Sequence, residues 1–146
     1  MKLHKISRID FSLLNINFWL RRRMDNVVSP YGVSGAQSRI LRYIRDQKKP
    51  IYQKDIERAF CQRRSSVSEM VKGLEKQGFL IRESVEGDAR LKKMVLTPKA
   101  LELIDSVKKV MDDNEALLHS ALSEAEFETF VDCCYKMRLK IEESGY

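Results

Sequence analysis

The residues best suited to binding chemistry lie near the middle of the 146-residue chain, between positions 63 and 76. Arginine and lysine bind phosphates, whereas serine and glutamate can hydrogen-bond to the edges of bases. A helix from about Ser66 to Gln77 would turn Val67 and Leu74 inward and leave polar side chains on the opposite face. The candidate DNA-binding residues of this segment are Arg63, Arg64, Ser65, Ser66, Ser68, Glu69, Lys72 and Lys76.

These residues also have purely structural explanations. The segment Ser66-Val67-Ser68-Glu69 matches a capping box, in which Glu69 would serve only its own helix. Arg63 and Arg64 could be ordinary solvated charges. Their expected place at a helix N-terminus, where N–H groups favour phosphate, instead suits a binding role.

A second cluster of charged residues follows at positions 88–93 and adds the candidates Asp88, Arg90 and Lys92, with Lys93 beside them. A short loop that offers arginine suits a narrow, electronegative minor groove of DNA. The alternative is a solvated hairpin in which an Asp88–Arg90 surface pair contributes little.

Both clusters need elements that hold them, and the sequence predicts two short helices followed by a hairpin. The first helix is expected around residues 53–60, and a turn at residues 61–64 leads to the second, which Gly78 ends with left-handed backbone. The hairpin is expected from strands at residues 79–84 and 91–96 with a tip at residues 85–90. This order is typical of a winged helix-turn-helix, whose second helix enters the major groove.

Further helices are expected on both sides of this unit. Ser34 is a good N-cap for a helix that turns Ile40, Leu41 and Ile44 inward. Thr97-Pro98 opens a helix that continues to about Ser120. Ser123 and Glu126 form a capping box for a last helix from Glu124, whose apolar side carries Phe127, Phe130, Val131, Cys134 and Ile141.

An N-terminal helix over residues 6–20 is predicted to carry two apolar stripes. One stripe contains Ile6, Ile9, Leu13, Ile16 and Leu20, and the other contains Phe11, Leu14 and Phe18. A surface helix of a monomer needs only one such stripe. We therefore expect one stripe to pack on the chain itself and the other on a second subunit.

Charge and cysteine content narrow the class of protein. Residues 1–49 carry 11 basic and 3 acidic residues, residues 51–99 carry 11 and 7, and residues 100–146 carry 5 and 11. A basic body with an acidic C-terminal third suits a polyanion such as DNA. The three cysteines, Cys61, Cys133 and Cys134, show no zinc or disulfide pattern, so no metal is expected and a cytoplasmic location, on the nucleoid when bound to DNA, is favoured.

Other classes lack their signatures. The longest apolar stretch, Phe11 to Leu20, is too short to span a bilayer, so no membrane association is expected. The sequence has no phosphate-cradling glycine loop, no metal-ligand cluster and no nucleophile–base signature, so an enzyme is not expected and no cofactor is predicted.

The stretch from Val33 to Ala100 resembles the MarR family of bacterial winged helix-turn-helix transcriptional regulators. The segments that carry the resemblance are "QKDIERAF", "RRSSVSEMVKGLEKQGFLIR" and "GDARLKKMVLTPKA". Asp88, Arg90, Leu96 and Thr97 match the family's wing and following helix start, and the flanking helices match its dimerisation region. The resemblance implies that Asp88 orients a wing arginine and that Arg90 enters the minor groove. Tyr52, Cys61 and Gln62 depart from the residues common in the family at the helix cap and in the turn.

The resemblance implies one mainly α-helical domain over residues 1–146 with a small β-hairpin wing. Residues 33–99 would form the winged helix-turn-helix, and residues 1–30 and 100–146 the helical dimerisation part. The implied function is a homodimeric repressor that binds a pseudo-palindromic double-stranded DNA operator and is released by a small aromatic or amphipathic effector. Effectors of the family bind between its two parts, where Phe18, Trp19, Tyr31 and Tyr43 would line a cleft unless they are core residues.

Two alternatives stay open. Cys61 in the expected turn could switch the same DNA site by oxidation, or it could be a small apolar filler; Cys134 is expected in the core and Cys133 at the surface. A winged helix can also serve protein assembly without DNA, because a fold does not fix a function.

Overall fold

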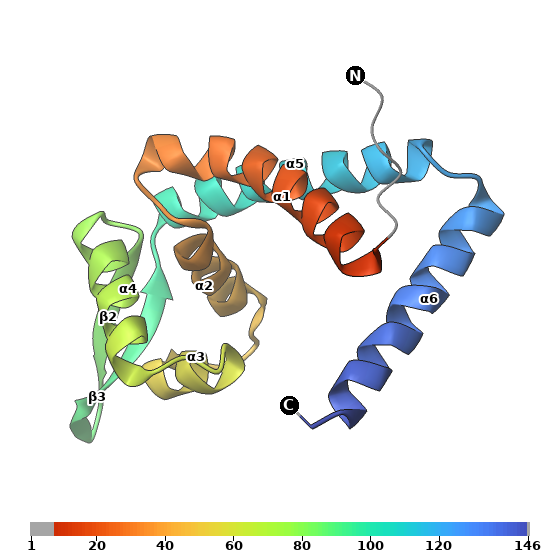
Figure 1. Ribbon diagram of the computed structural model, residues 1–146. Helices are drawn as coiled ribbons and strands as arrows, with labels where there is room; N and C mark the ends of the chain where they lie inside the picture. The colour runs from red at the N-terminus through yellow and green to blue at the C-terminus, as the bar shows by residue number, and fades with distance from the viewer. Residues whose placement is uncertain (1–7, 146) are drawn as a thin grey trace. The chain divides into compact units, whose positions relative to one another are not determined.

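A computed structural model describes residues 8–145 and is mainly helical with one small sheet (Figure 1). The elements, in chain order, are α1 (Ile9–Val28), the 3₁₀-helix η1 (Ser29–Tyr31), α2 (Gly35–Asp46), β1 (Ile51–Tyr52), α3 (Gln53–Ala59), α4 (Arg64–Lys76), β2 (Leu80–Val85), β3 (Asp88–Leu96), α5 (Pro98–Ser120) and α6 (Glu124–Glu143). This confirms the predicted fold class, a helical protein with a hairpin wing. The chain divides into two compact units, Met1–Val110 and Met111–Tyr146, with the boundary inside α5.

Helix α2 begins as its cap predicts. The Ser34 hydroxyl accepts a hydrogen bond from the Gln37 backbone N–H, and the Ser34 N–H donates to Gln37 Oε1 at 2.9 Å. These two bonds satisfy N–H groups that have no partner within the helix. Ile40, Leu41 and Ile44 are buried, as expected.

Helices α3 and α4 form the helix-turn-helix. The Asp55 carboxylate accepts a hydrogen bond from the Tyr52 N–H at 2.9 Å, so α3 is capped although Tyr52 replaces the usual serine or threonine. Cys61 lies in the turn with φ at 49°, in the left-handed region where glycine is favoured. At the other end of α4, Gly78 has φ at 77°, which confirms the predicted helix end.

The start of α4 differs from the prediction. The helix begins at Arg64, because the Arg63 carbonyl already accepts from the Val67 N–H at 3.1 Å. Ser66 is therefore the third helical residue, so the predicted capping box of Ser66 with Glu69 is wrong.

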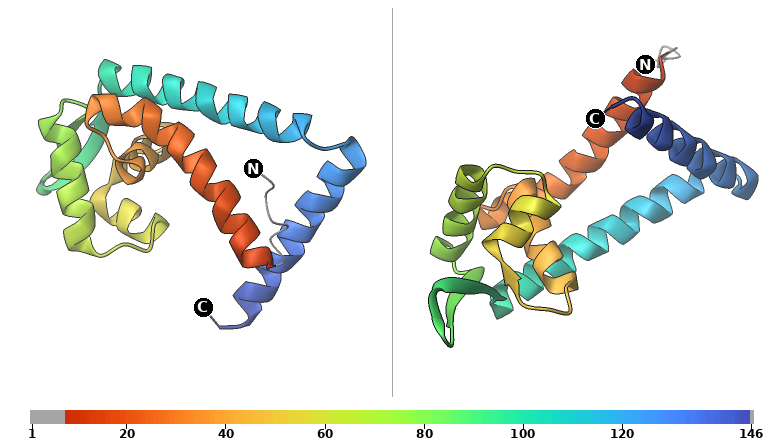
Figure 2. Two further views of the ribbon diagram at one scale, coloured as in Figure 1. Left: turned by 45° about the horizontal axis from the view of Figure 1, so that its top comes forward. Right: turned by 90° about the horizontal axis from the view of Figure 1, so that it is seen from below.

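The wing is a three-stranded antiparallel sheet in the order β1-β3-β2, and its hairpin projects beyond the helices (Figure 2). The sequence analysis missed β1, whose Ile51 pairs with Met94 and whose Tyr52 pairs with Lys93. It also made the tip too long. Strand β3 begins at Asp88, so only Glu86 and Gly87 connect the strands, and Arg90 belongs to a strand rather than to the loop.

The core of the first unit joins all of its elements. Phe79, Leu103, Ile104 and Val107 are fully or almost fully buried together with the inner faces of α2 and α4. Val67, Val71 and Leu74 of α4 belong to this core, so the recognition helix is anchored along its inner face.

Helix α1 is longer than predicted and its apolar stripes lie at the surface. It continues beyond Leu20 to Val28, and its packing on the core involves Met24, Val27 and Val28. Ile9, Phe11, Leu14 and Phe18 are each more than half exposed, and Leu13 and Ile16 are also exposed. The expectation that one full stripe packs against the same chain is therefore wrong. Ile6 lies outside the described residues.

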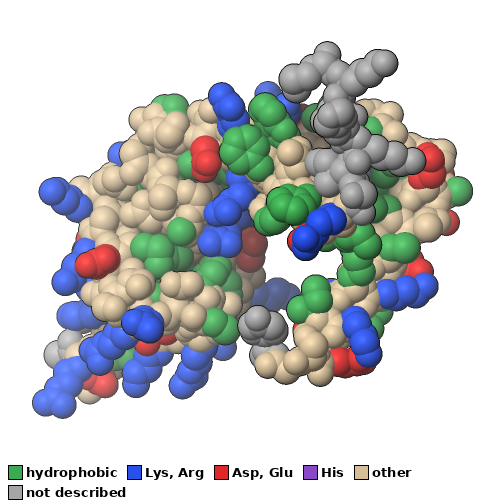
Figure 3. Space-filling view, viewed as in Figure 1, with side chains coloured by type: hydrophobic (Ala, Val, Ile, Leu, Met, Phe, Trp, Pro, Cys, Tyr) green, Lys and Arg blue, Asp and Glu red, His purple; other side chains and the backbone are tan. Residues whose placement is uncertain are grey.

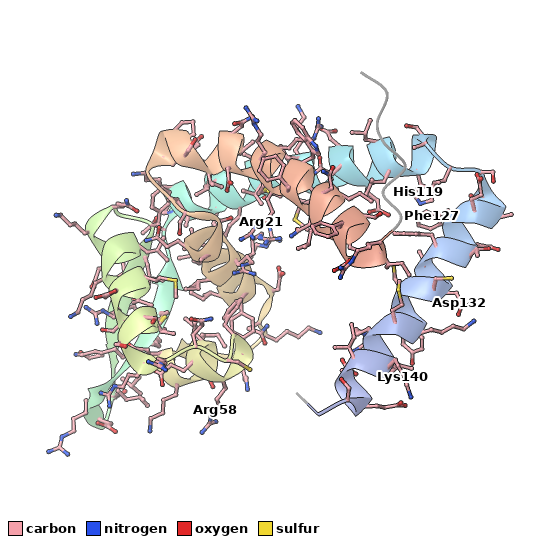
Figure 4. The ribbon with its side chains drawn as sticks, viewed as in Figure 1. Arg21, Arg58, His119, Phe127, Asp132 and Lys140 are labelled. Atoms are coloured by element: carbon pink, nitrogen blue, oxygen red, sulfur yellow. The ribbon has the colours of Figure 1, made fainter. Side chains whose placement is uncertain are left out.

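The second unit contains the end of α5 and all of α6. Ser123 and Glu126 form the predicted capping box, and two hydrogen bonds from Ser123 hold the pKa of Glu126 below its usual value. The rings of His119 and Phe127 face each other across the helix–helix turn, with centroids 3.6 Å apart (Figure 4). The predicted apolar side of α6 is not buried, and Phe130, Val131 and Ile141 are exposed. Cys134 is half-buried rather than a core residue, and Cys133 is exposed.

Candidate nucleic-acid interface

Helix α4 presents the predicted polar face to solvent. Val67, Val71 and Leu74 bury the opposite face, so rotation along the helix directs Ser65, Glu69, Lys72 and Lys76 outward, and all four are exposed. Ser66 and Ser68 are half-buried at the edges of this face. Because Glu69 is not part of a capping box, its carboxylate is available as an acceptor for a base amino group.

The N-terminus of α4 adds positive charge at the same face. Arg63 is the N-cap and Arg64 the first helical residue, and both side chains are exposed. The first N–H groups of a helix carry partial positive charge and lack partners within the helix. Two guanidinium groups beside them make this end suitable for a phosphate.

The wing holds its charged side chains in different ways. Asp88 Oδ1 accepts a hydrogen bond from the Arg90 backbone N–H at 2.9 Å. Lys92 donates to the Ser84 hydroxyl on the neighbouring strand. The ammonium of Lys93 pairs with the Glu83 carboxylate at 2.9 Å, and this hydrogen bond raises the pKa of Lys93. Arg90 is exposed, and its guanidinium has no ion-pair partner within the described chain.

A groove of about 410 Å³ connects the wing with the helix-turn-helix. Its charged lining comes from β1–α3, α4 and both long strands, with six Lys or Arg and two acidic residues. The cations are Lys54, Arg58, Arg64, Arg82, Arg90 and Lys92. The structure thus brings Arg64 of α4 and Arg90 of the wing, predicted from separate segments, to one site.

The sequence analysis missed Lys54 and Arg58 of this groove. Both lie on the exposed side of α3, four residues apart and away from buried Ile56, and Arg58 points away from the helix (Figure 4). A basic pair at this helical spacing was the signal that could have identified them.

The pairing of cations separates two groups. Arg82 is neutralised by Glu75, and Lys93 by Glu83. Within residues 8–145, the following cations of α3, α4 and the wing form no ion pair: Lys54, Arg58, Arg63, Arg64, Lys72, Lys76 and Arg90. Lysine and arginine side chains gather over the wing and α3 on the face seen in Figure 3. Unpaired cations in this number favour an anionic partner.

The remaining candidates have mixed outcomes. Cys61 is exposed, so its interpretation as an apolar filler is wrong. Tyr31 packs edge-to-face on buried Phe79, and Tyr43 packs on Phe60 in the same way, which favours packing roles for both tyrosines. Phe18 and Trp19 are exposed on α1. The described residues contain no group of three or more His, Cys, Asp or Glu that could hold a metal ion, and none of their helices is long and apolar enough to cross a membrane.

Two helices joined by a tight turn, followed by a three-stranded sheet with a projecting hairpin, define a winged helix-turn-helix protein. The MarR family model matches residues 31–91. The chain is 30% identical over 117 residues to the HTH-type transcriptional regulator PecS of Dickeya dadantii (strain 3937), covering 79% of this chain and 70% of PecS. The chain belongs to the MarR family, which consists of transcriptional regulators rather than enzymes.

Solved structures show the same fold along most of the chain. MepR, a transcription regulator of the Staphylococcus aureus multidrug efflux pump MepA, is 23% identical with a TM-score of 0.75, covering 92% of this chain and 98% of MepR. A MepR–DNA complex is 24% identical with a TM-score of 0.71, covering 90% of this chain and 98% of that chain. The YusO protein of Bacillus subtilis is 21% identical with a TM-score of 0.71, covering 90% and 92%.

Proposed function

We propose that this protein is a sequence-specific, double-stranded DNA-binding repressor that acts as a homodimer on a pseudo-palindromic operator. The observation that carries DNA binding is the groove in which unpaired cations of α3, α4 and the wing come together. Its walls combine an α-helix N-terminus with exposed arginine, which suits a phosphate backbone. The outward face of α4, with Glu69 and two serines, supplies groups for base edges.

Each predicted residue has a proposed role in this complex. Arg63, Arg64, Lys72 and Lys76 contact phosphates, and Arg90 enters the minor groove while Asp88 holds its backbone. The following residues face the major groove or its edges: Ser65, Ser66, Ser68 and Glu69. Lys92 extends the cationic surface of the wing, and Lys54 and Arg58 extend it on α3.

The homodimer is supported by apolar surface that the chain leaves uncovered. On α1, Phe11, Leu14, Phe18 and Trp19 are each more than half exposed. Large contiguous apolar patches are rare on monomeric proteins and mark interaction sites. Since residues 1–30 and 100–146 hold most of this surface, we propose that they form the dimerisation part of a single domain.

Release by an effector is the finer part of the proposal. A hollow of about 230 Å³ lies between α2, the end of α3 and α4. Ile40, Phe60 and Met70 give it an apolar lining, and Arg39 and Gln62 add polar groups. This lining suits a small aromatic or amphipathic effector with an acceptor group.

Selection from a random duplex library tests the function. We expect the wild-type protein to enrich a sequence with two related half-sites, because each subunit of a dimer reads one. Mapping of bound DNA in the native cell would then give the regulated genes. Failure to enrich any duplex would reject the repressor and favour a winged-helix protein-interaction module.

The exposure of Cys61 supports a second candidate, a regulator switched by cysteine oxidation. Its thiol is accessible in the turn that leads into α4, where a bulky adduct would disturb DNA docking. Binding to the selected duplex before peroxide, after peroxide and after thiol reduction distinguishes this switch from effector release. A reversible loss that is absent in Cys61→Ser would establish it.

A further inference from the structure

Two glutamine side chains connect the recognition helix α4 to the junction between α1 and α2. Gln77 is the C-cap of α4, and its Nε2 donates a hydrogen bond to the Gly32 carbonyl at 2.8 Å. Gly32 follows η1, the short helix between α1 and α2. The two residues are 45 positions apart, so this bond is a tertiary contact.

Gln37 makes the second connection. Its Oε1 accepts from the Ser34 N–H at 2.9 Å and completes the cap of α2, while its Nε2 donates to the Met70 carbonyl of α4 at 3.3 Å. Gly73 leaves room for this approach, because a Cβ at that position would lie 2.8 Å from Gln37 Nε2. One amide thus belongs to the cap of α2 and to the side of α4.

The Gln77 amide is satisfied at only one of its ends. Its Oε1 is buried and has no hydrogen-bond partner among residues 8–145. A buried unpaired acceptor lowers stability. A methionine of similar shape would avoid this loss, so the glutamine is better explained by the position it enforces than by the stability it adds.

We propose that Gln37 and Gln77 are positioning residues that set the orientation of α4 for reading DNA sequence. This inference rests on the proposed DNA-binding function. Base contacts require several side chains of one helix to align at once, whereas phosphate contacts tolerate a small shift of the helix. Loss of either connection therefore reduces discrimination between the selected duplex and random DNA, and leaves binding to random DNA nearly unchanged.

Three variants break these connections by different chemistry. Gln77→Met removes the donor to Gly32 together with the unpaired oxygen. Gln37→Glu keeps the acceptor for the Ser34 N–H, since glutamate also serves in capping boxes, but loses the donor to Met70. Gly73→Ala places a methyl group against Gln37 Nε2 while it raises helix propensity. Gln47→Met, at the C-cap of α2, is the matched control.

The readout is the ratio of affinities for the duplex selected by the wild type and for random duplex, at one salt concentration, beside thermal melting. We expect each of the three variants to lower this ratio by about three- to tenfold, the effect of losing one net hydrogen bond, with an unchanged Gln47→Met ratio. Gln77→Met and Gly73→Ala are expected to melt no lower than the wild type.

The outcomes separate this inference from the proposed function. If the wild type selects no duplex, the proposed function fails. If it selects one and the folded variants keep the wild-type ratio, or lose both affinities equally, DNA binding stands and the positioning role is wrong. If one variant does not fold, the ratios of the other two decide.

Discussion

The Asp88 carboxylate accepts a hydrogen bond from the backbone N–H of Arg90, with 2.9 Å between Oδ1 and N. The same carboxylate forms no ion pair with the Arg90 guanidinium in the described chain. Aspartate commonly holds the backbone two residues ahead in this way. The wing aspartate therefore restrains the strand from which Arg90 projects and leaves the guanidinium available for DNA.

A pair of substitutions at Asp88 separates this restraint from charge. Asp88→Asn keeps an oxygen acceptor, whereas Asp88→Ala removes it, and both remove the negative charge. We expect Asp88→Ala to bind the selected duplex more weakly than wild type, and Asp88→Asn to bind at least as tightly as wild type. Fluorescence anisotropy at matched salt gives the comparison. Equal tightening by both substitutions would show that Asp88 acts only by repelling phosphate.

Arg90 is expected to contribute to affinity without contributing to folding. Its exposed side chain lacks an ion-pair partner in residues 8–145, and a narrow minor groove concentrates negative potential. Arg90→Ala should weaken binding to the selected duplex by about 1–3 kcal/mol, the scale of one good specific contact. The free energy of unfolding should change by less than about 0.5 kcal/mol. Unchanged binding would mean that the wing is only a solvated hairpin.

Local patterns predicted much of this fold because caps and periodicity are local. Ser34, Gly78 and Ser123 mark helix ends, and their short-range bonds form as the sequence indicates. β1 was missed because two residues, Ile51 and Tyr52, show no period, and their strand exists only through pairing with β3. The start of α4 was misplaced because Ser66 and Glu69 have capping-box spacing, although the helix already begins at Arg64.

The candidate site was harder to predict than the fold. Arg64 and Arg90 were found separately, but their common groove depends on tertiary packing. Lys54 and Arg58 look like an ordinary solvated face until the groove places them beside the wing. The roles of Gln37 and Gln77 could not be predicted, because their partners Met70 and Gly32 are distant in sequence.

The turn residue Cys61 gives a test of backbone strain. Its φ of 49° is costly for a residue with a Cβ and is freely adopted by glycine. Cys61→Gly should raise the free energy of unfolding by about 0.5–1 kcal/mol, since relief of strain exceeds the added entropy of the unfolded chain. Cys61→Ala is the control, because it removes the thiol and keeps the strain. Urea denaturation measures both, and a Cys61→Gly protein no more stable than Cys61→Ala would contradict the argument.

Lys72 should act through a phosphate rather than a base. It is exposed on α4 and unpaired in the described chain, and its flexible ammonium suits a phosphate. Lys72→Ala should weaken selected and random duplexes by similar factors and flatten the plot of log K against log salt by about 0.9 per subunit contact. Lys109→Ala, which removes the same charge from exposed α5, should change neither quantity. A loss confined to one base identity would instead make Lys72 a reader of sequence.

The last prediction concerns the uncovered surface of α1. Leu13 and Ile16 are 39% and 42% exposed, and Leu14 and Phe18 beside them are more exposed still. An aspartate at either position places a charge in a dehydrated interface if two chains meet there, and an isolated buried charge is far more costly than a solvated one. Leu13→Asp combined with Ile16→Asp should therefore give dissociated or unfolded protein. Asn15→Asp adds a charge to the same helix at an exposed polar position and should leave the dimer intact. Sedimentation velocity at micromolar concentration distinguishes these states, and circular dichroism separates dissociation from unfolding. A well-folded wild-type monomer under these conditions would reject the homodimer and with it the two half-sites of the proposed operator.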